Sequence, residues 1–364
     1  MRKPKTGSLL LDSSPLLTVI PTPPDHSSTA VIEEIPGLIK LHRNGHVERL
    51  PAMPEVPSTY SPEPGVVSGD VTINPSAGLW ARVYVPRYPA RHQLPVLLYF
   101  HGGGFCVGSP AWRCYHNFLA RLAGTAGCVV VSASYRLAPE HRLPAAYEDG
   151  VAALAWLRQQ AGRAGADPGG WGWRARCDFG RVFVAAKQVL IFIRSLTVFT
   201  GDSAGAAIAY SATAPDITPP ARVRGLILIQ PFFSGEARTS SERNLAQSAK
   251  SALTLAAADC YWRLSLPTGT NRDSVWCNPI CDEGLKKMES WKMPPVLLCV
   301  AEMDILRDRN LEFCRALNRA GKRVELQMYG GVGHAFQVLQ NYSLSQIRTT
   351  ELISDVKDFM TSSR

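Results

Sequence analysis

The chain has 364 residues, of which 46% are hydrophobic, and a formal net charge of +9 at pH 7. This composition is ordinary for a globular protein, and the length suits one α/β domain with insertions. The basic residues are scattered and form no stripe interleaved with aromatic residues, which argues against a nucleic-acid partner. No apolar run is long enough to span a membrane.

Nine cysteines are dispersed among apolar segments. An odd, dispersed set indicates free buried thiols in a reducing compartment, so we expect a cytoplasmic protein. The basic start of the chain, MRKPKTGSLLLDSS, leaves an organelle transit peptide open, but its apolar run is too short for a secretory signal. The spacing of Cys277 and Cys281 could hold a metal, yet no His or second Cys pair accompanies them, so we expect no metal site.

The N-terminal part divides into an extension and the start of a domain. Residues 1–30 are rich in Pro, Ser and Thr, which predicts a disordered extension before a domain over 31–364. Within 33–50, Asn44-Gly45 lies between alternating apolar positions and predicts a β-hairpin. A Pro-rich loop follows at 51–65.

The rest of the chain alternates between strand and helix patterns. Strands are predicted at about 79–85, 94–100, 128–134, 181–185, 223–230, 294–301 and 324–329. Helices are predicted near 112–124, 145–160, 203–213, 308–320 and 346–360. This alternation favours a mainly parallel sheet with helices on both faces. Residues 234–290 lack a strand pattern, and we interpret them as a cap segment.

The first chemical signal is HGGGF at 101–105, directly after the apolar strand at 94–100. Successive glycines let backbone N–H groups turn toward a ligand, and fixed donors stabilise the charge that develops on a carbonyl oxygen in acyl transfer. We therefore expect the amides of Gly103, Gly104 and Ala204 to form an oxyanion hole. A flexible glycine turn is the alternative interpretation.

The second signal is GDSAG at 201–205, a G-x-S-x-G pattern with Ser203 at its centre. A serine in this pattern lies on a tight strand-to-helix turn that exposes its hydroxyl above the sheet. Gly201 and Gly205 leave room for close packing where a Cβ would clash. The sequence therefore predicts Ser203 as a nucleophile.

An acid and a base follow in the expected order. Asp304 ends the apolar strand PPVLLCVAEMD, and His334 lies in GGVGHAF after the last strand. The order Ser, Asp, His is that of an α/β-hydrolase triad. The competing acids are Glu302, within the end of the strand, and Asp308, a good helix-start residue. The competing histidines, which fit less well, are His101, His116 and His141.

With these motifs the chain resembles the plant carboxylesterases of the hormone-sensitive-lipase-like group of α/β hydrolases. That group includes the gibberellin receptors and the 2-hydroxyisoflavanone dehydratases. The matching segments are HGGGFCVGS (101–109), YRLAPEHRLPAAYEDG (135–150), GDSAGA (201–206), DILRDR (304–309) and GHAF (333–336). The resemblance runs from about Val31 to the C-terminus. It implies an α/β-hydrolase fold, a cap formed by the N-terminal segment and about 234–290, and the triad and oxyanion hole named above.

One segment departs from the family pattern. In the family a strand like RVFVA (181–185) runs straight into GDSAG, whereas here AKQVLIFIRSLTVFT (186–200) intervenes. Long loops are unusual at this position. Either SLTVFT (195–200) replaces RVFVA as the strand, or 186–200 is an aberrant insertion from an intron translated in frame. We favour the second interpretation; Lys187 and Arg194 argue against a membrane span.

These observations predict a serine carboxylic-ester hydrolase that acts on a small-molecule ester and needs no cofactor. The first alternative is a hormone receptor on the same fold; the receptor branch of the family lacks the triad histidine, whereas His334 is present here. The second alternative is a dehydratase of a flavonoid-like substrate. Family dehydratases carry Thr or Ser at the nucleophile position, so Ser203 does not decide between the two activities.

Overall fold

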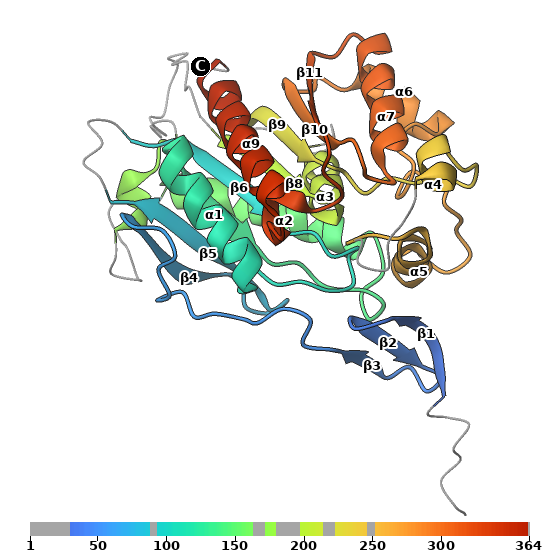
Figure 1. Ribbon diagram of the computed structural model, residues 1–364. Coiled ribbons are helices and arrows are strands. Elements are labelled where there is room, and N and C mark those ends of the chain that lie inside the picture. The colour runs from blue at the N-terminus through green and yellow to red at the C-terminus, as the bar shows by residue number, and fades with distance from the viewer. Residues whose placement is uncertain are drawn as a thin grey trace, which may run out of the picture.

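A computed structural model describes residues 30–87, 93–162, 172–179, 197–213, 223–245 and 252–362. Its main sheet contains β4 (Val66–Asn74), β5 (Leu79–Pro86), β6 (Val96–Phe100), β7 (Val129–Ala133), β8 (Thr197–Asp202), β9 (Val223–Ile229), β10 (Val296–Ala301) and β11 (Val324–Tyr329). The strand order is β11-β10-β9-β8-β6-β7-β5-β4 (Figure 1). The pairs from β11 to β7 are parallel, and β5 and β4 join antiparallel. The mainly parallel sheet is therefore confirmed.

Helices cover both faces of this sheet. On one face lie α1 (Arg113–Ala126) and α9 (Ser343–Ser362), side by side in Figure 1. On the other lie α2 (Ala145–Gly162), α3 (Ala204–Ala212) and α7 (Arg307–Arg319). Further short helices are η1 (Trp173–Arg176), a 3-10 helix, and α8 (Phe336–Leu339). None of the helices in the described ranges is long and apolar enough to cross a membrane.

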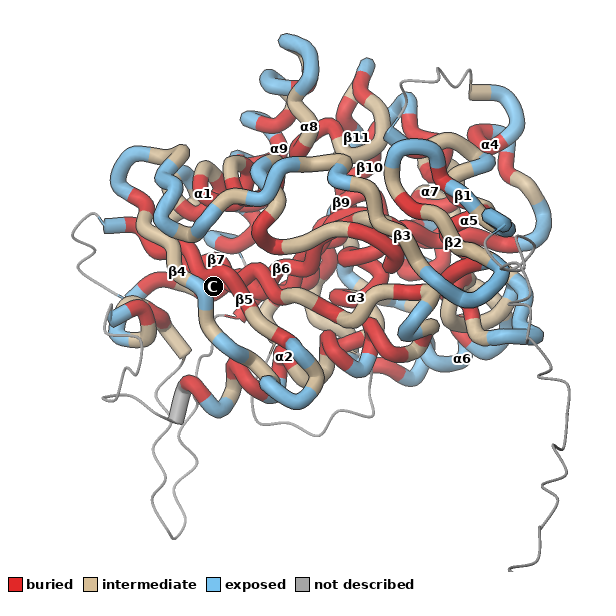
Figure 2. The backbone as a smooth tube through the Cα atoms, turned by 90° about the horizontal axis from the view of Figure 1, so that it is seen from below, coloured by how far each residue is buried: buried red, intermediate tan, exposed pale blue. Residues whose placement is uncertain are grey.

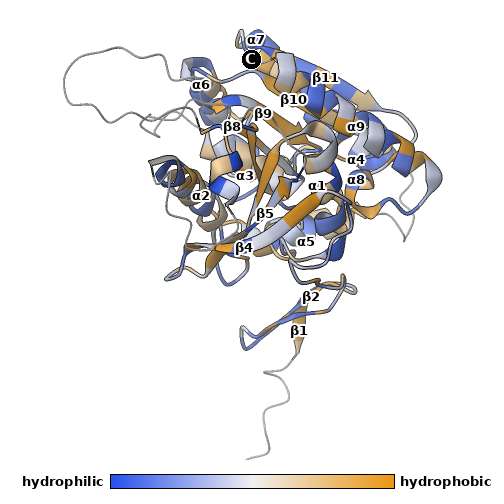
Figure 3. Cartoon of the chain, turned by 90° about the vertical axis from the view of Figure 1, so that its left-hand side faces the viewer, coloured by the Kyte–Doolittle hydropathy of each residue, from blue (hydrophilic) through white to orange (hydrophobic). Residues whose placement is uncertain are grey.

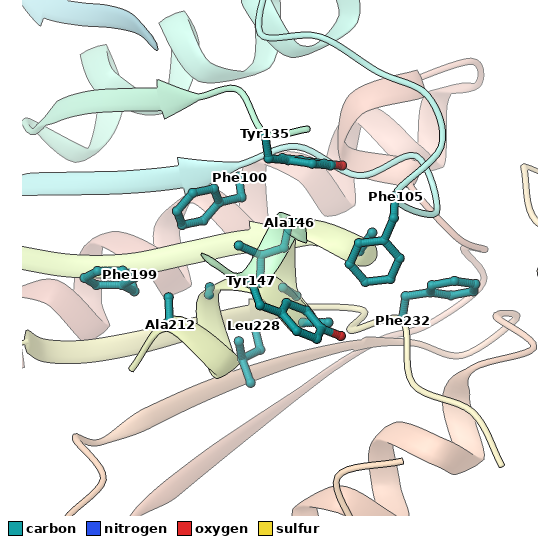
Figure 4. Close-up of a cluster of buried hydrophobic side chains, with 14 of the residues drawn as sticks. Phe100, Phe105, Tyr135, Ala146, Tyr147, Phe199, Ala212, Leu228 and Phe232 are labelled. Carbon is teal, nitrogen blue, oxygen red and sulfur yellow. The ribbon is translucent and has the colours of Figure 1, made fainter. Parts of the chain in front are cut away.

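The core fills both sides of the strands because side chains alternate along them. In β6, Leu97 and Tyr99 pack toward α1 and α9, while Leu98 and Phe100 pack toward α2 and α3. Both faces of the central strands are covered, so these strands are buried, as Figure 2 shows, and largely apolar, as Figure 3 shows. Phe100 and Phe199 meet across β6 and β8 with ring centroids 6.5 Å apart (Figure 4).

The N-terminal segment forms a separate small sheet of β1 (Val31–Ile35), β2 (Ile39–His42) and β3 (Val47–Arg49). Asn44 and Gly45 connect β2 to β3, and Gly45 has a φ of +83°. The Asn44 side chain accepts a hydrogen bond from the His46 amide at 3.0 Å. The predicted hairpin is confirmed at this turn.

The described parts of the cap segment contain short helices. These are α4 (Ser240–Asn244), α5 (Leu255–Ser265) and α6 (Asp282–Ser290). The Arg263 guanidinium on α5 donates to both carboxylate oxygens of Glu33 on β1, at 2.6 and 2.8 Å. This pair joins the N-terminal sheet to the helical cap, so the two segments expected to cover the site contact each other.

Two strands differ from the sequence prediction. β4 was not expected, because VVSGDVTIN contains Gly69 and Asp70, which are disfavoured in strands; it is tolerated at the sheet edge. The strand that leads into the tight turn at GDSAG, which we call the nucleophile elbow, is β8; it is drawn from SLTVFT, the alternative to RVFVA. The strand predicted at 181–185 and residues 1–29 of the predicted disordered extension lie outside the described residues. The origin of 186–200 stays a prediction.

Candidate active site

Ser203 lies between the end of β8 and the start of α3. Its φ of 53° and ψ of −119° are rarely adopted by a residue with a side chain, and such strain is concentrated at functional sites. The turn is tight: a Cβ on Gly205 would lie 2.0 Å from the Phe100 carbonyl oxygen, and one on Gly201 would lie 2.3 Å from the Gly205 backbone. The steric reason for both glycines is therefore confirmed, and the strained turn presents the Ser203 hydroxyl to the cavity.

The structure brings Ser203, His334 and Asp304 into one hydrogen-bonded chain. Asp304 follows β10 and His334 follows β11, so both lie at the carboxyl ends of parallel strands. His334 Nδ1 lies 2.7 Å from Asp304 Oδ2, and His334 Nε2 lies 3.0 Å from Ser203 Oγ. A carboxylate only accepts, so Nδ1–H donates to Asp304, which leaves Nε2 to accept the Ser203 hydroxyl proton.

The competing acids have other partners. Glu302 accepts a hydrogen bond from the Gly331 amide at 2.8 Å. Asp308 pairs with Arg307 and accepts from the Ser241 amide. Asp304 is the carboxylate that reaches His334, and its second oxygen accepts from the Leu306 amide at 3.0 Å.

The competing histidines are also engaged elsewhere. His101 is buried, stacks on Tyr135 and donates from Nδ1 to the Gly102 carbonyl at 2.8 Å; burial lowers its pKa to about 4, so its ring is neutral. His116 Nε2 lies 2.7 Å from the Tyr60 carbonyl oxygen. His141 is exposed. His334 is therefore the histidine that contacts Ser203.

The glycine loop after β6 approaches the same serine. Gly103 and Gly104 line the cavity with Ser203, and their φ values are +114° and +57°. A Cβ on Gly104 would lie 2.3 Å from the Tyr261 ring, so glycine is required there for space as well as for conformation. Within the described ranges, the amides of Gly103, Gly104 and Ala204 donate no hydrogen bond. These amides therefore have no competing acceptor in the described structure, and the oxyanion hole stays a prediction.

Burial and nearby carboxylates act in opposite directions on His334. Burial lowers the pKa of the imidazole, while the charge and hydrogen bond of Asp304, together with the charge of Asp202, raise it. The net result is a pKa above the ordinary value for histidine. The surroundings therefore favour the protonated imidazole, the state that exists after a base has taken a proton.

A cavity of about 220 Å³ opens at this chain of residues. Apolar side chains from three parts of the fold dominate its wall. The N-terminal segment contributes Leu38 and Met53, the cap contributes Leu253 and Tyr261, and Phe232 comes from the turn after β9. Figure 4 shows Phe232 beside Phe105 at this end of the core. No Lys or Arg lines the cavity among the residues that the structure describes, nor is any group of three or more His, Cys, Asp or Glu placed to hold a metal ion.

Sequence reasoning did not identify four polar residues that support the site. Asp202, Tyr99 and Tyr115 form a buried network beside Ser203. Gln230 follows β9 with a φ of 48° and accepts from the Ala335 amide at 2.7 Å, next to His334. The position of Asp202 inside GDSAG was a usable signal, because a carboxylate beside a buried nucleophile needs partners. Nothing in the sequence pattern marked the other three.

Known proteins resemble this chain along most of its length. The family model described as alpha/beta hydrolase fold matches residues 97–189 and 191–338. Probable carboxylesterase 6 of Arabidopsis thaliana is 42% identical over 95% of this chain and 96% of its own. A gibberellin receptor of the same plant is 33% identical over 79% of this chain and 80% of its own.

Among solved structures, an esterase from Pyrobaculum calidifontis is 27% identical, with a TM-score of 0.63 over 81% of this chain and 84% of its own. The match to the family model extends over both the glycine loop and the elbow, so it includes the regions that form the candidate site. The chain belongs to the α/β hydrolase family, in the group that contains the plant carboxylesterases and the gibberellin receptors.

Proposed function

We propose that this protein hydrolyses small-molecule carboxylic esters, with Ser203 as nucleophile, His334 as general base and acid, and Asp304 as the residue that orients the imidazole. The observation that carries the proposal is the continuous hydrogen-bonded chain from Ser203 through His334 to Asp304 at the strained turn. The carboxylesterase relative and the esterase structure support the same reaction class.

The geometry supports a two-step mechanism. His334 Nε2 takes the Ser203 proton as Oγ bonds to the ester carbonyl carbon, and the carbonyl oxygen becomes an oxyanion. The amides of Gly103, Gly104 and Ala204 then donate to that oxygen. When the intermediate collapses, the carbon–oxygen bond to the alcohol breaks and protonated His334 gives its proton to the departing oxygen.

Water completes the cycle. His334, neutral again, takes a proton from a water molecule as its oxygen bonds to the acyl carbon. The second intermediate expels Ser203 Oγ, which regains the proton from His334, and the carboxylic acid leaves. No step uses a cofactor.

The binding-only alternative is less well supported. A receptor would need the cavity but not a base in contact with the serine, whereas His334 Nε2 lies 3.0 Å from Ser203 Oγ. The apolar side chains that dominate the cavity wall favour an uncharged ester. The nine cysteines are all free, seven of them buried, which supports a location in the reducing cytoplasm.

The test compares Ser203→Ala with a matched control. Ser203→Ala should lower the turnover of p-nitrophenyl acetate on the order of a million-fold, as expected when a triad member is lost. A fluorophosphonate probe should label the wild-type protein at Ser203 and leave the variant unlabelled. Ser132→Ala is the control, since Ser132 is also buried and its hydroxyl has no hydrogen-bond partner in the described structure. Equal activity in wild type and Ser203→Ala would overturn the proposal.

A further inference from the structure

Asp202 is a fully buried carboxylate directly before the nucleophile, and the mechanism above gives it no role. Its side chain is 1% exposed. Tyr99 donates its hydroxyl to Asp202 Oδ1 at 2.6 Å, and Tyr115 donates to Oδ2 at 3.1 Å. The Gly102 amide donates to Oδ1 at 3.0 Å. A carboxylate with this burial is costly unless donors surround it, so three donors, two from β6 and the loop after it and one from α1, indicate a built network.

The network links the two loops that must act together. Gly102 belongs to the glycine loop after β6, and Asp202 belongs to the elbow after β8. The Gly102 amide donates both to Asp202 Oδ1 and to the Tyr115 hydroxyl oxygen, the latter at 2.8 Å. Contact is close enough that a Cβ on Gly102 would lie 2.8 Å from Asp202 Oδ2. The carboxylate therefore fixes the residue immediately before Gly103 and Gly104 relative to Ser203.

We propose that Asp202 is a positioning residue that ties the glycine loop to the nucleophile elbow, so that the oxyanion donors keep their distance from Ser203 while it reacts. This inference deepens the proposed function and rests on it. A donor displaced by about 1 Å can lower the rate about a hundred-fold, which is why two loops from different strands need a direct tie.

The charge of Asp202 has a second effect, on the pKa of His334. The titratable groups that face it are Tyr99 on β6, Cys114 and Tyr115 on α1, Tyr135 after β7, and His334. Burial raises the pKa of Asp202 to about 6, although its hydrogen bonds and His334 pull it down. Ionised Asp202 in turn raises the pKa of His334. Removal of the charge should therefore move the acidic limb of the pH–rate profile to lower pH.

Two variants separate the effect of the hydrogen bonds that Asp202 accepts from the effect of its charge. Asp202→Ala removes both, and kcat for p-nitrophenyl acetate should fall about a hundred-fold with KM within about three-fold. Asp202→Asn keeps an oxygen that can accept from Gly102, so kcat should fall about ten-fold at most. Its acidic limb should shift to lower pH. This partial rescue by the amide, with the pH shift, is not expected of a residue that only stabilises the fold.

A tyrosine pair keeps the test decisive if Asp202→Ala does not fold. Tyr115→Phe removes one of the two acceptors of the Gly102 amide, and kcat should fall about five-fold. Tyr84→Phe is the matched control: Tyr84 is also a buried tyrosine, but its hydroxyl lies 3.2 Å from His116 Nδ1, and kcat should not change.

The outcomes distinguish this inference from the proposed function. Hydrolysis that survives Ser203→Ala refutes the proposed function. Hydrolysis that depends on Ser203, but is the same in Tyr115→Phe and Tyr84→Phe and unshifted in pH by Asp202→Asn, overturns the positioning role alone. Equal losses in the two Asp202 variants, without a pH shift, also overturn it.

Discussion

Two segments of the sequence, RVFVA (181–185) and LTVFT (196–200), could each form the strand that leads into the elbow. Two deletions of equal length can decide between these segments. Removing 186–200 joins RVFVA (181–185) to Gly201, while removing 181–195 joins Gly180 to LTVFT (196–200). Both variants lose the apolar run VLIFI (189–193), which has the composition of an aggregation-prone window. Both should therefore be more soluble than the full chain, and any difference between them reports the strand alone.

Either deletion can be accommodated without disturbing the sheet. Cys177 pairs with Leu94 and Thr197 pairs with Val96, so the chain leaves and rejoins the edge of β6 within two residues, about 7 Å. In each shortened chain, the connection from Cys177 to Gly201 is about three residues longer than an extended strand needs. Shortening this connection about three-fold lowers the entropic cost of closing it by about 1 kcal/mol. For a protein of this size that gain corresponds to about 1 °C in melting temperature.

The strand sequences differ in which face carries the large side chain. In β8, Phe199 packs against Phe100, and Val198 points to the opposite face. After deletion of 186–200, Val184 would stand in place of Phe199 and Phe183 in place of Val198. A lost phenyl ring on one face and an added ring on the other each cost about 1–3 kcal/mol in a core not shaped for them. The two deletions should therefore differ by about 2–4 kcal/mol, more than the shared entropic gain.

If 186–200 derives from an intron, the core evolved around RVFVA and the deletion of 186–200 should be the more stable and more active protein. The assay is urea unfolding together with p-nitrophenyl acetate hydrolysis for the full chain and both deletions. The dominant transcript should also lack the codons for 186–200. The reasoning is refuted if the deletion of 186–200 unfolds while the deletion of 181–195 stays folded and active, because β8 as seen here would then be the native strand.

Three further predictions concern the site. Asp304→Asn should lower kcat on the order of ten thousand-fold, whereas Glu302→Gln, its matched control after the same strand, should change it less than about three-fold, measured with p-nitrophenyl acetate. The pKa of His334 is raised, and only its neutral ring can act as a base. As the pH is lowered, activity should therefore have fallen by half while the pH is still above about 6.5, the ordinary pKa of histidine. A half-maximal point well below that pH would contradict the assignment of His334 as the base. Gly104→Ala should lower kcat about a hundred-fold, because the added Cβ would overlap the Tyr261 ring. Adding Tyr261→Ala to that variant should not restore kcat fully, since the φ of +57° at residue 104 stays unfavourable for alanine.

Much of the fold could be predicted because its strands are buried on both faces. Apolar runs such as LPVLLYF and PPVLLCVAEMD are distinct in the sequence, and β6 and β10 lie within them. β4 could not be predicted in this way, since an edge strand with Gly69 and Asp70 has no such run. The elbow strand was ambiguous for the opposite reason: two adjacent apolar segments both satisfy the pattern, and local sequence does not choose between them.

The site shows the same division between local and long-range information. Ser203, Asp304 and His334 could be predicted to lie together because each follows a strand or occupies a motif, and strand ends in a parallel sheet converge. Asp202 was visible in the motif, but its partners come from β6 and α1, and only the folded chain brings Tyr99 and Tyr115 to it.

The carboxylates of Asp202 and Asp304 affect the charge of the site as well as its geometry. His334 lies near two carboxylates that act differently on it: Asp304 by charge and a hydrogen bond, Asp202 by charge alone. Loss of the Asp304 carboxylate should remove orientation and charge together, whereas loss of the Asp202 charge should change the pH dependence and leave the imidazole oriented. A double variant, Asp202→Asn with Asp304→Asn, would leave burial as the main influence on the imidazole. Its residual activity should therefore have its acidic limb at a lower pH than either single variant.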